Sequence, residues 1–444
     1  MIRQIWDRLP LGLISAGLQL DRTLGAAIAT RLWQAFAGPL TLILLIRSLT
    51  LGEQGVYYAL TGIVSIQAYF ELGLLNVLVS HSGHQMAGVD QADDQAKELA
   101  SARMRDLIRS SFRWFGMAAL LYLATALGFG WFTLWDSQVS WQLPLLALIP
   151  VAAISVWLAP AMSILEGAGQ RDLVYRIRFL QMVIGSLCVW IALALDLKLW
   201  ALVVSAMVQA VVLIYVRFVM QIAFFSRFEA VKRQASDFVW TRDIVPMQWR
   251  MALIGMTFHF ATQFFTIIVI KFHSDVEAGP LGMTLSLTSA IQMLALAWVQ
   301  TKYPVVSNYH GAGNRELAGT LWRRTAIVST ALLVVACLSL MLLIAALPML
   351  DRGIEKNFLQ PWQVGILSIG CLGSHIASVQ GFYVLSRKAN PLLAASLIGS
   401  ITTAILVWCG GYMYSTNGVI TGYAIGMMLI LVPVHTWAYL RFRQ

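Results

Sequence analysis

The chain has 444 residues, of which 59% are hydrophobic and 12% are charged, and its formal net charge is +10. A soluble domain has about 25% charged residues, and apolar runs of about 20 residues, long enough to cross a bilayer, recur along this whole sequence. The composition therefore excludes an ordinary soluble protein and indicates a polytopic membrane protein.

The first 23 residues precede the apolar spans and carry a short apolar run of their own. No small-residue cleavage site follows this run, and Asp21 and Arg22 separate it from the next apolar segment, so a removable signal peptide is disfavoured. We expect an interfacial lead-in helix that stays in the chain.

Twelve segments of low charge follow in chain order. A backbone amide has no partner in lipid, and the dyad alternation of a membrane β-barrel is absent, so every segment is expected to be helical. The predicted fold class is all-α, a polytopic integral membrane protein with twelve transmembrane helices in two six-helix lobes related as parallel repeats. The charged loop 85–111 is expected to hold a short surface helix. The predicted spans are 24–46, 54–80, 112–135, 140–165, 174–195, 199–225, 248–270, 279–301, 319–349, 361–386, 391–410 and 415–439.

The positive charges orient these spans. If the N-terminus is cytoplasmic, most of the 31 Lys and Arg residues fall in inside segments, which predicts that both termini are cytoplasmic. The basic balance then indicates contact with the inner leaflet rather than with nucleic acid. The basic residues left in outside segments are Arg47, Lys198, Lys271, Arg352 and Lys356.

A weak internal repeat divides the chain. A shift of 224 positions places Arg47 on Lys271 and Gly55 on Gly279. We predict an N-terminal lobe over 1–226 with the lead-in, a cytoplasmic linker over 227–247 and a C-terminal lobe over 248–444. Six helices return the chain to its starting side, so the lobes are parallel repeats, as in transporters that rock around a central site. Spans one, two, seven and eight are expected to line the cleft.

Two ionisable side chains lie inside the first two spans. Arg31 and Glu71 both lie about 24 Å from the outer turn at 1.5 Å per helical residue, on adjacent antiparallel helices. Charged groups at such depth face the bundle interior with a partner. Two interpretations stay open: a permanent structural ion pair, or a diphosphate-binding arginine that Glu71 holds between cycles.

Polar side chains also recur at helical spacing in the second half. His259, Thr262, Gln263 and Thr266 form an i, i+3, i+4, i+7 stripe. This pattern is consistent either with hydrogen bonds between helices or with a cavity wall that binds sugars. Arg176 and Arg178 lie on nearly opposite sides of span five, so at most one of them faces a cavity. The candidate substrate-binding residues are Arg31, Arg47, Arg176, His259, Gln263, Lys271, Gln292 and His375.

The stretch IRSLTLGEQGVYYALTGIVSIQAYFELGL resembles the opening pattern of polysaccharide transporters of the O-antigen flippase type, within the multidrug/oligosaccharidyl-lipid/polysaccharide (MOP) exporter superfamily. The residues that match the pattern are Arg47, Leu49, Gly52, Glu53, Gly55, Tyr57, Glu71, Leu72, Gly73 and Leu74. An arginine often found after this motif is replaced by Ser80-His81. The resemblance implies transfer of an undecaprenyl-diphosphate-linked oligosaccharide from the inner to the outer leaflet of the bacterial plasma membrane.

Two other functions stay open. A membrane-embedded glycosyltransferase or polymerase would need large outside loops with polar catalytic groups, and the predicted outside loops are short. A drug or cation antiporter of the same superfamily needs membrane carboxylates, and the spans offer only Glu71 and the marginal Glu166. Neither paired carboxylates nor a nucleophile constellation indicates an enzyme, and neither a cofactor nor a metal site is predicted. The expected partners are the lipid-linked glycan, membrane lipids, a polysaccharide polymerase and a chain-length regulator.

Overall fold

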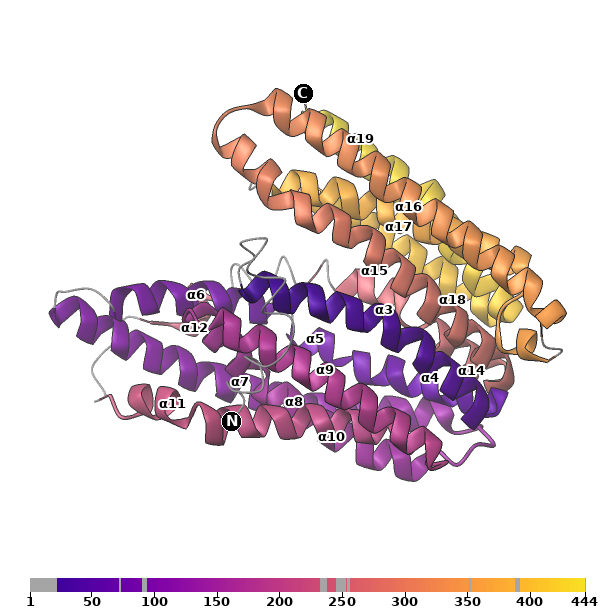
Figure 1. Ribbon diagram of the computed structural model, residues 1–444, viewed down its shortest axis with the longest axis horizontal. Coiled ribbons are helices and arrows are strands. Elements are labelled where there is room, and N and C mark those ends of the chain that lie inside the picture. The colour runs from indigo at the N-terminus through magenta and orange to yellow at the C-terminus, as the bar shows by residue number, and fades with distance from the viewer. Residues whose placement is uncertain are drawn as a thin grey trace. The chain divides into compact units, whose positions relative to one another are not determined.

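The computed structural model describes residues 22–71, 73–89, 94–231, 238–244, 253, 256–350, 353–387 and 392–443. The predicted lead-in helix therefore lies outside the described residues, apart from its last two positions. Every regular element in these ranges is helical, which confirms the all-α membrane fold predicted from the composition (Figure 1).

The chain divides into two compact units. Unit one comprises Met1–Ser48, Phe70–Leu127 and Leu143–Trp249; unit two comprises Leu49–Tyr69, Gly128–Gln142 and Arg250–Gln444. Two segments of the predicted N-terminal lobe, 49–69 and 128–142, thus group with the second unit. The lobe boundaries and the linker predicted at 227–247 otherwise stay a prediction.

Unit one contains the helices of the first six spans, except for residues 49–69 of the second and the end of the third, from 128 on. From Asp94 on, the charged segment expected to hold a short surface helix forms the beginning of α7, which continues to Leu134 because no proline interrupts its good helix formers. Its helices are α3 (Arg22–Ser48), α6 (Leu74–Val89), α7 (Asp94–Leu134), α8 (Gln142–Gly167), α9 (Arg171–Ala194), α10 (Trp200–Tyr215), a π-helical turn (Val216–Met220), α11 (Ile222–Glu229) and α12 (Trp240–Asp243).

Aromatic and hydroxyl side chains join α3 to α9 within unit one. The indole rings of Trp33 and Trp190 stack at 5.8 Å, and the Trp190 indole N–H donates to the Thr41 hydroxyl at 2.8 Å. Nearer the end of α3, the Ser48 hydroxyl donates to the Leu193 carbonyl at 3.1 Å. These contacts place the helix that carries Arg31 and Arg47 against the fifth span.

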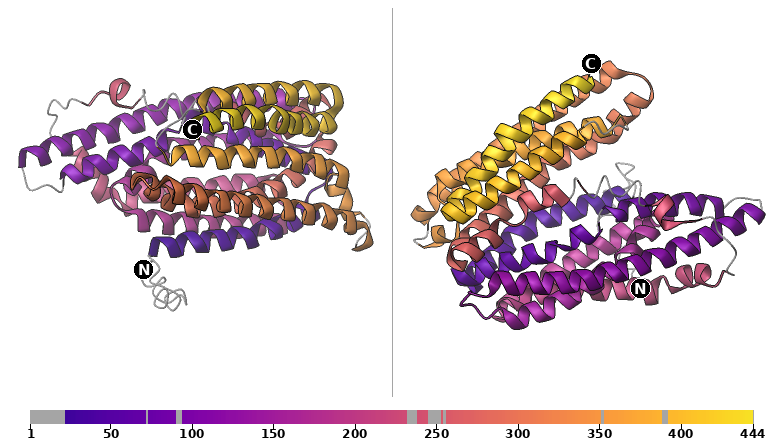
Figure 2. Two further views of the ribbon diagram at one scale, coloured as in Figure 1. Left: turned by 90° about the horizontal axis from the view of Figure 1, so that it is seen from above. Right: turned by 180° about the vertical axis from the view of Figure 1, so that it is seen from behind.

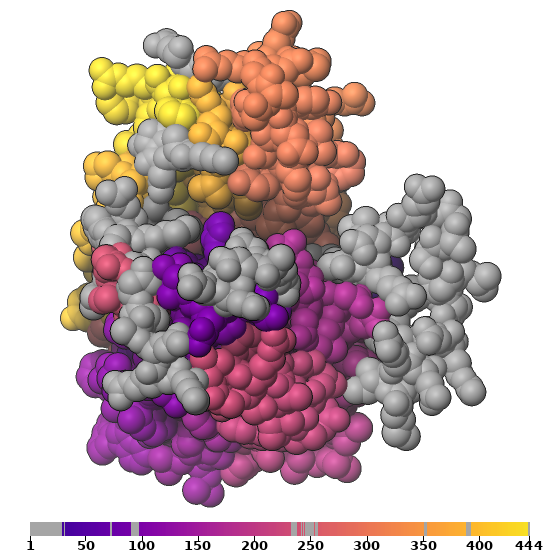
Figure 3. Space-filling view, turned by 90° about the vertical axis from the view of Figure 1, so that its left-hand side faces the viewer, coloured from indigo at the N-terminus to yellow at the C-terminus, as the bar shows by residue number. Residues whose placement is uncertain are grey.

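Unit two contains the first half of the second span, the segment 128–142 and the last six spans. Helices α16, α17 and α18 run side by side in both ribbon views (Figures 1 and 2). The turn between α15 and α16 lies at the same end of this unit as the C-terminal helix α19 (Figure 3). Its elements are α4 (Leu51–Ser65), α5 (Gln67–Glu71, shared with unit one), α14 (Phe265–Phe272), α15 (Asp275–Gly311), α16 (Arg315–Leu350), a 3-10 turn (Ile354–Asn357), α17 (Pro361–Leu385), α18 (Leu393–Ala424), a π-helical turn (Ile425–Leu431) and α19 (Val432–Arg443).

The last two predicted spans are the two arms of one hairpin. Tyr414 and Ser415 have non-helical torsions inside α18, and the chain reverses there. A Cβ on Gly410 would lie 2.5 Å from the carbonyl oxygen of Gly418, and one on Gly418 would lie 1.8 Å from that of Gly410. Glycine on both arms therefore lets the two backbones touch.

Each of the twelve predicted spans contains helix in the residues that the structure describes. Eight helices there are long and apolar enough to cross a membrane, and a ninth is added if the bent pair Leu51–Glu71 and Leu74–Val89 is counted as one span. Helix α3, the segment 256–272 and the second arm of the hairpin supply the others.

Helix α4 crosses α15 at a pair of glycines in unit two. A Cβ on Gly55 would lie 2.0 Å from the Asp275 carbonyl oxygen, and a Cβ on Gly279 would lie 2.4 Å from that of Leu51. Each glycine thus faces the carbonyl of the residue four positions before the other glycine. This reciprocal contact supports the 224-residue repeat, because Leu51 and Gly55 are the repeat mates of Asp275 and Gly279.

We expect Gly55→Ala to destabilise this crossing, because the added methyl group meets backbone atoms of α15 that cannot rotate away. Overpacking of this kind costs about 1–3 kcal/mol. The check is the thermal unfolding midpoint of the purified protein in detergent. Gly52→Ala, one turn earlier, is the matched control, since its methyl group would meet only side chains, at 3.5 Å or more. Equal midpoints for the two variants would contradict the crossing.

The predicted orientation is tested by single cysteines at exposed positions, in a background with Cys409→Ser because Cys409 is an exposed thiol. Gln138→Cys, in a segment predicted outside, should react with an impermeant thiol reagent added to sealed cells. Asn314→Cys, in a segment predicted inside, should react only after the membrane is permeabilised. The reverse labelling pattern would overturn the assignment of cytoplasmic termini.

Candidate functional site

Two of the predicted spans are broken near their middle. The second span stops at Ser65, continues as the short α5 and resumes at Leu74 after Gly73, whose φ of 67° suits a residue without a side chain. The seventh span stops at Thr262, passes through Gln263 and Phe264 and resumes as α14. Broken helices at membrane depth are typical of transporter binding sites, because they present backbone groups and side chains to a cavity.

The second span, at its first break after Ser65, contacts the seventh span at its break near Gln263, and both segments belong to unit two. His259 Nε2 lies 3.1 Å from the Ser65 hydroxyl. The Tyr69 ring packs edge-on against the His259 ring at 5.1 Å and stacks on Phe264 at 6.3 Å. Four side chains thus connect two segments that are nearly 200 residues apart in sequence.

An apolar groove of 560 Å³ lies beside this contact. The Phe260 and Trp408 rings stack within it at 5.4 Å with an interplanar angle of 6°. The Tyr69 hydroxyl and the Trp408 indole N–H are buried and have no hydrogen-bond partner among the described residues. We call this the aromatic groove; its lining residues are Tyr69, Leu253, Met256, Thr257, Phe260, Ile401, Ala404, Ile405, Trp408 and Cys409.

The helical stretch 256–262 has two chemically different faces. Met256, Thr257 and Phe260 line the aromatic groove, whereas His259 points to Ser65. Gln263 is exposed at the break itself. The stretch 256–262 therefore presents apolar side chains to the groove and a polar side chain to the second span.

The predicted polar stripe on span seven is divided by this break. The Thr262 hydroxyl donates to the carbonyl of Phe258 in its own helix at 3.0 Å. Thr266 lies beyond the break in α14 and is 4% exposed. Thr266 is therefore the buried member of the stripe, whereas His259 and Thr262 are half-buried and Gln263 is exposed at the break.

The two other polar candidates of the second half lie between helices of unit two. The Gln292 amide on α15 donates to the Ser374 hydroxyl on α17 at 3.1 Å. His375 on α17 is fully buried, and its Nε2 lies 3.1 Å from the Ser329 hydroxyl on α16. Both residues take part in interhelical hydrogen bonds, and a substrate role for them stays a prediction.

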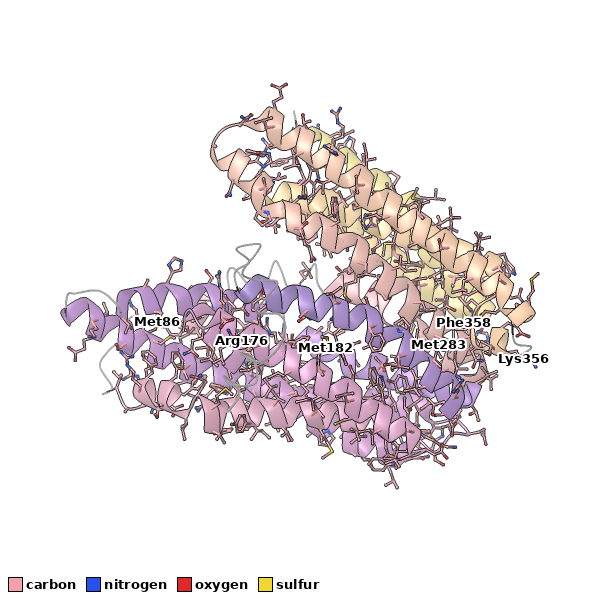
Figure 4. The ribbon with its side chains drawn as sticks, in the orientation of Figure 1. Met86, Arg176, Met182, Met283, Lys356 and Phe358 are labelled. Carbon is pink, nitrogen blue, oxygen red and sulfur yellow. The ribbon has the colours of Figure 1, made fainter. Side chains whose placement is uncertain are left out.

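The basic candidates occupy different surroundings. Arg176 forms a two-pronged ion pair with Asp172 on its own helix, at 2.7 and 3.0 Å, and Arg178 pairs with Glu166 at 3.1 Å. Lys271 donates to the Phe132 carbonyl at 2.9 Å and lies 3.5 Å from Asp136. Arg47 is exposed in the last turn of α3. Figure 4 labels Arg176 in the middle of unit one.

The predicted pair of Arg31 and Glu71 stays untested. The side chain of Arg31 lies outside the described part of the structure, although its backbone belongs to α3. Glu71 at the end of α5 forms no ion pair with any side chain that the structure describes. Both interpretations of the pair therefore remain proposals.

Sequence reasoning did not select Tyr69 or Trp408. Tyr69 lies two residues before the matched motif position Glu71, and Trp408 lies outside every motif identified in the sequence. An aromatic residue next to a predicted helix break is the signal that would have pointed to Tyr69. The sequence contains no comparable signal for Trp408, because its role depends on the packing of α18 against the seventh span.

No protein-family model matches the sequence, and no curated protein matches it. Solved structures do match over most of the chain. An inward-facing multidrug resistance MATE family transporter of the MOP superfamily is 14% identical, with a TM-score of 0.57, and the match covers 89% of this chain and 94% of that one. The lipid II flippase MurJ in an inward closed conformation is 12% identical, also with a TM-score of 0.57, over 93% and 90% of the two chains.

A third similar structure is a MOP superfamily transporter from Pyrococcus furiosus, described as having a binding pocket of reversed polarity. It is 15% identical, with a TM-score of 0.54, over 95% of this chain and 96% of that one. At such low identity the likeness concerns the fold. The chain thus has the polytopic transporter fold that these MOP superfamily transporters and the lipid II flippase MurJ share.

Proposed function

We propose that the chain is a flippase that moves an undecaprenyl-diphosphate-linked oligosaccharide, an O-antigen or exopolysaccharide repeat unit, from the inner to the outer leaflet of the bacterial plasma membrane by alternating access. The observation that carries this proposal is the two-faced helix at the break of span seven. Its aromatic groove suits an isoprenoid tail, and its His259 side suits a polar head group.

The physical argument follows from the shape of such a cargo. A polyprenyl chain can stay in the apolar phase while only the diphosphate and glycan need a polar path. A diphosphate in a low-dielectric surrounding requires cations or hydrogen-bond donors beside its route. The proposed cations are Arg31 at membrane depth, and Arg47 and Lys271 at the outer ends of spans one and seven.

Acidic groups are scarce in the apolar parts of the described spans. Glu166 pairs with Arg178 at 3.1 Å, which leaves Glu71 as the acidic side chain near a helix break. A site with few carboxylates favours an anionic cargo over a cationic one. Fold alone does not choose between these, since both drug transporters and a lipid flippase have it.

The alternative is a drug or cation antiporter, and one observation favours it. The aromatic groove is almost wholly apolar and would accept a lipophilic drug as well as a prenyl chain. Only a head-group requirement separates the two functions. A transporter of lipid-linked glycans needs the diphosphate, whereas a drug antiporter does not.

We expect the protein in proteoliposomes to move undecaprenyl-diphosphate-N-acetylglucosamine between leaflets, as detected by lectin access. Trp408→Ala should slow this transfer about two- to tenfold, because it removes one ring of a stacked aromatic pair. Trp135→Ala, at an exposed position outside the groove, is the control and should leave the rate unchanged. Transport of ethidium without transfer of the lipid would support the antiporter instead.

The role of Arg31 is tested by single and double variants at matched membrane levels. Arg31→Ala should reduce transfer at least about tenfold, because a charge-assisted hydrogen bond contributes about 1.5–3 kcal/mol. Arg31→Lys keeps the charge but not the two-pronged geometry, so part of the activity should remain. If Arg31 serves only Glu71, then Arg31→Ala combined with Glu71→Ala restores transfer. Such a rescue would contradict the proposed contact between Arg31 and the diphosphate.

A further inference from the structure

A second concave site lies at the end of unit two that is predicted to face outside. It has a volume of 460 Å³ and lies between the start of α15, the 3-10 turn, the start of α17 and the tip of the α18 hairpin. Figure 4 labels Lys356 and Phe358 at this end, opposite the C-terminus. We call it the outer pocket. Its polar lining includes Glu277, Glu355, Lys356, Gln360, Gln363 and Asn417.

Hydrogen bonds fix the amides of the outer pocket in place. The Gln363 side-chain carbonyl accepts from the Gln360 backbone N–H at 2.8 Å, and its amide donates to the Asn417 side-chain oxygen at 2.7 Å. The Trp362 indole N–H donates to the Gln360 side-chain oxygen at 2.7 Å. Each terminal amide nitrogen of Gln363 and Asn417 carries two N–H donors, so donors remain for a ligand.

The hairpin tip that closes the pocket is strained. Ser415 has a φ of 52°, a left-handed value that a residue with a side chain seldom adopts, and its hydroxyl donates to the Glu277 carboxylate. Its neighbour Thr416 lines the pocket and is 8% exposed, yet its hydroxyl has no hydrogen-bond partner among the described residues. Strained backbone and unsatisfied buried polar atoms together are typical of binding sites.

We propose that the outer pocket binds the glycan part of the cargo, and that it selects neutral or amino sugars. This inference rests on the proposed function for the identity of the cargo. Planar amides and carboxylates bind neighbouring sugar hydroxyls through paired hydrogen bonds. The ring of Tyr414, which is 66% exposed on the pocket rim, offers an apolar face to a sugar ring.

The charge of the outer pocket defines what it excludes. The pocket lining contains two carboxylates, those of Glu277 and Glu355, and one ammonium group, that of Lys356. The Glu355 carboxylate is held in place because it accepts from the Gly353 backbone N–H at 2.7 Å. A net negative pocket repels a diphosphate and uronic acids and accepts hydroxyl, acetamido and ammonium groups. The glycan, rather than the lipid diphosphate, is therefore the expected occupant.

The test uses the full chain purified in detergent and three soluble disaccharides: chitobiose, its deacetylated form and a glucuronic-acid-containing disaccharide. Binding is followed by ligand-observed saturation-transfer NMR. The first two sugars should bind and the acidic one should not. Gln363→Ala and Tyr414→Ala should each weaken binding of chitobiose about tenfold, because each removes a direct contact.

Two controls separate binding from folding. Tyr414→Phe keeps the ring and should bind as the wild type does. Gln138→Ala removes an exposed amide of unit two that does not line the pocket, and it should also leave binding unchanged. Equal losses in Gln138→Ala and Gln363→Ala, tighter binding of the acidic sugar, or no saturable binding of any sugar would each overturn the proposal.

The same preparations distinguish this inference from the proposed function. Wild-type protein that moves the lipid-linked monosaccharide but binds none of the three disaccharides overturns the outer pocket alone. Protein that binds chitobiose through Gln363 but moves no lipid-linked saccharide retains the pocket as a sugar site and overturns the flippase.

Discussion

The crossing of α4 and α15 at Gly55 and Gly279 is the constraint on which the rest of unit two depends. Because each glycine faces a backbone carbonyl of the other helix, the two helices approach more closely than any side chain would permit. This closeness fixes the second span against the eighth. It thereby brings Ser65 and Tyr69, farther along the second span, to His259 and Phe264. The broken site is thus a consequence of a contact made several turns away.

The motif that resembles polysaccharide transporters contains structural residues whose roles are now visible. Glu53 closes a capping box with Thr50 at the start of α4, Gly55 makes the crossing, and Gly73 adopts a positive φ where the second span breaks. These roles concern turns and helix contacts. A motif of this kind is therefore informative about the fold, and it says less about the cargo than its resemblance suggests.

The fold was largely predictable from the sequence and the site was not. Long apolar runs specify membrane helices because lipid leaves no alternative for the backbone, so the predicted segments fall on helices wherever the structure describes them. Breaks within a membrane helix are harder to predict from the sequence. No proline marks the break at Gln263, and the helical spacing of the polar residues predicted an unbroken stripe there. Ion pairs are a second feature that the sequence did not predict. The spacing of Arg176 and Arg178 showed that they cannot share one helix face, but it did not show that Arg176 pairs with Asp172 on the same helix.

The outer pocket and the aromatic groove also bear on the direction of transport. A binding site on one side of the membrane changes how fast a cargo arrives and leaves, but it cannot shift the distribution of an otherwise identical lipid between two leaflets. Net export therefore requires either a coupled ion or the removal of the cargo outside. In the proposed setting a polysaccharide polymerase would consume the glycan at the outer surface. A pocket that holds the glycan by its sugars and repels its diphosphate would then leave the reacting phosphate bond free for that enzyme.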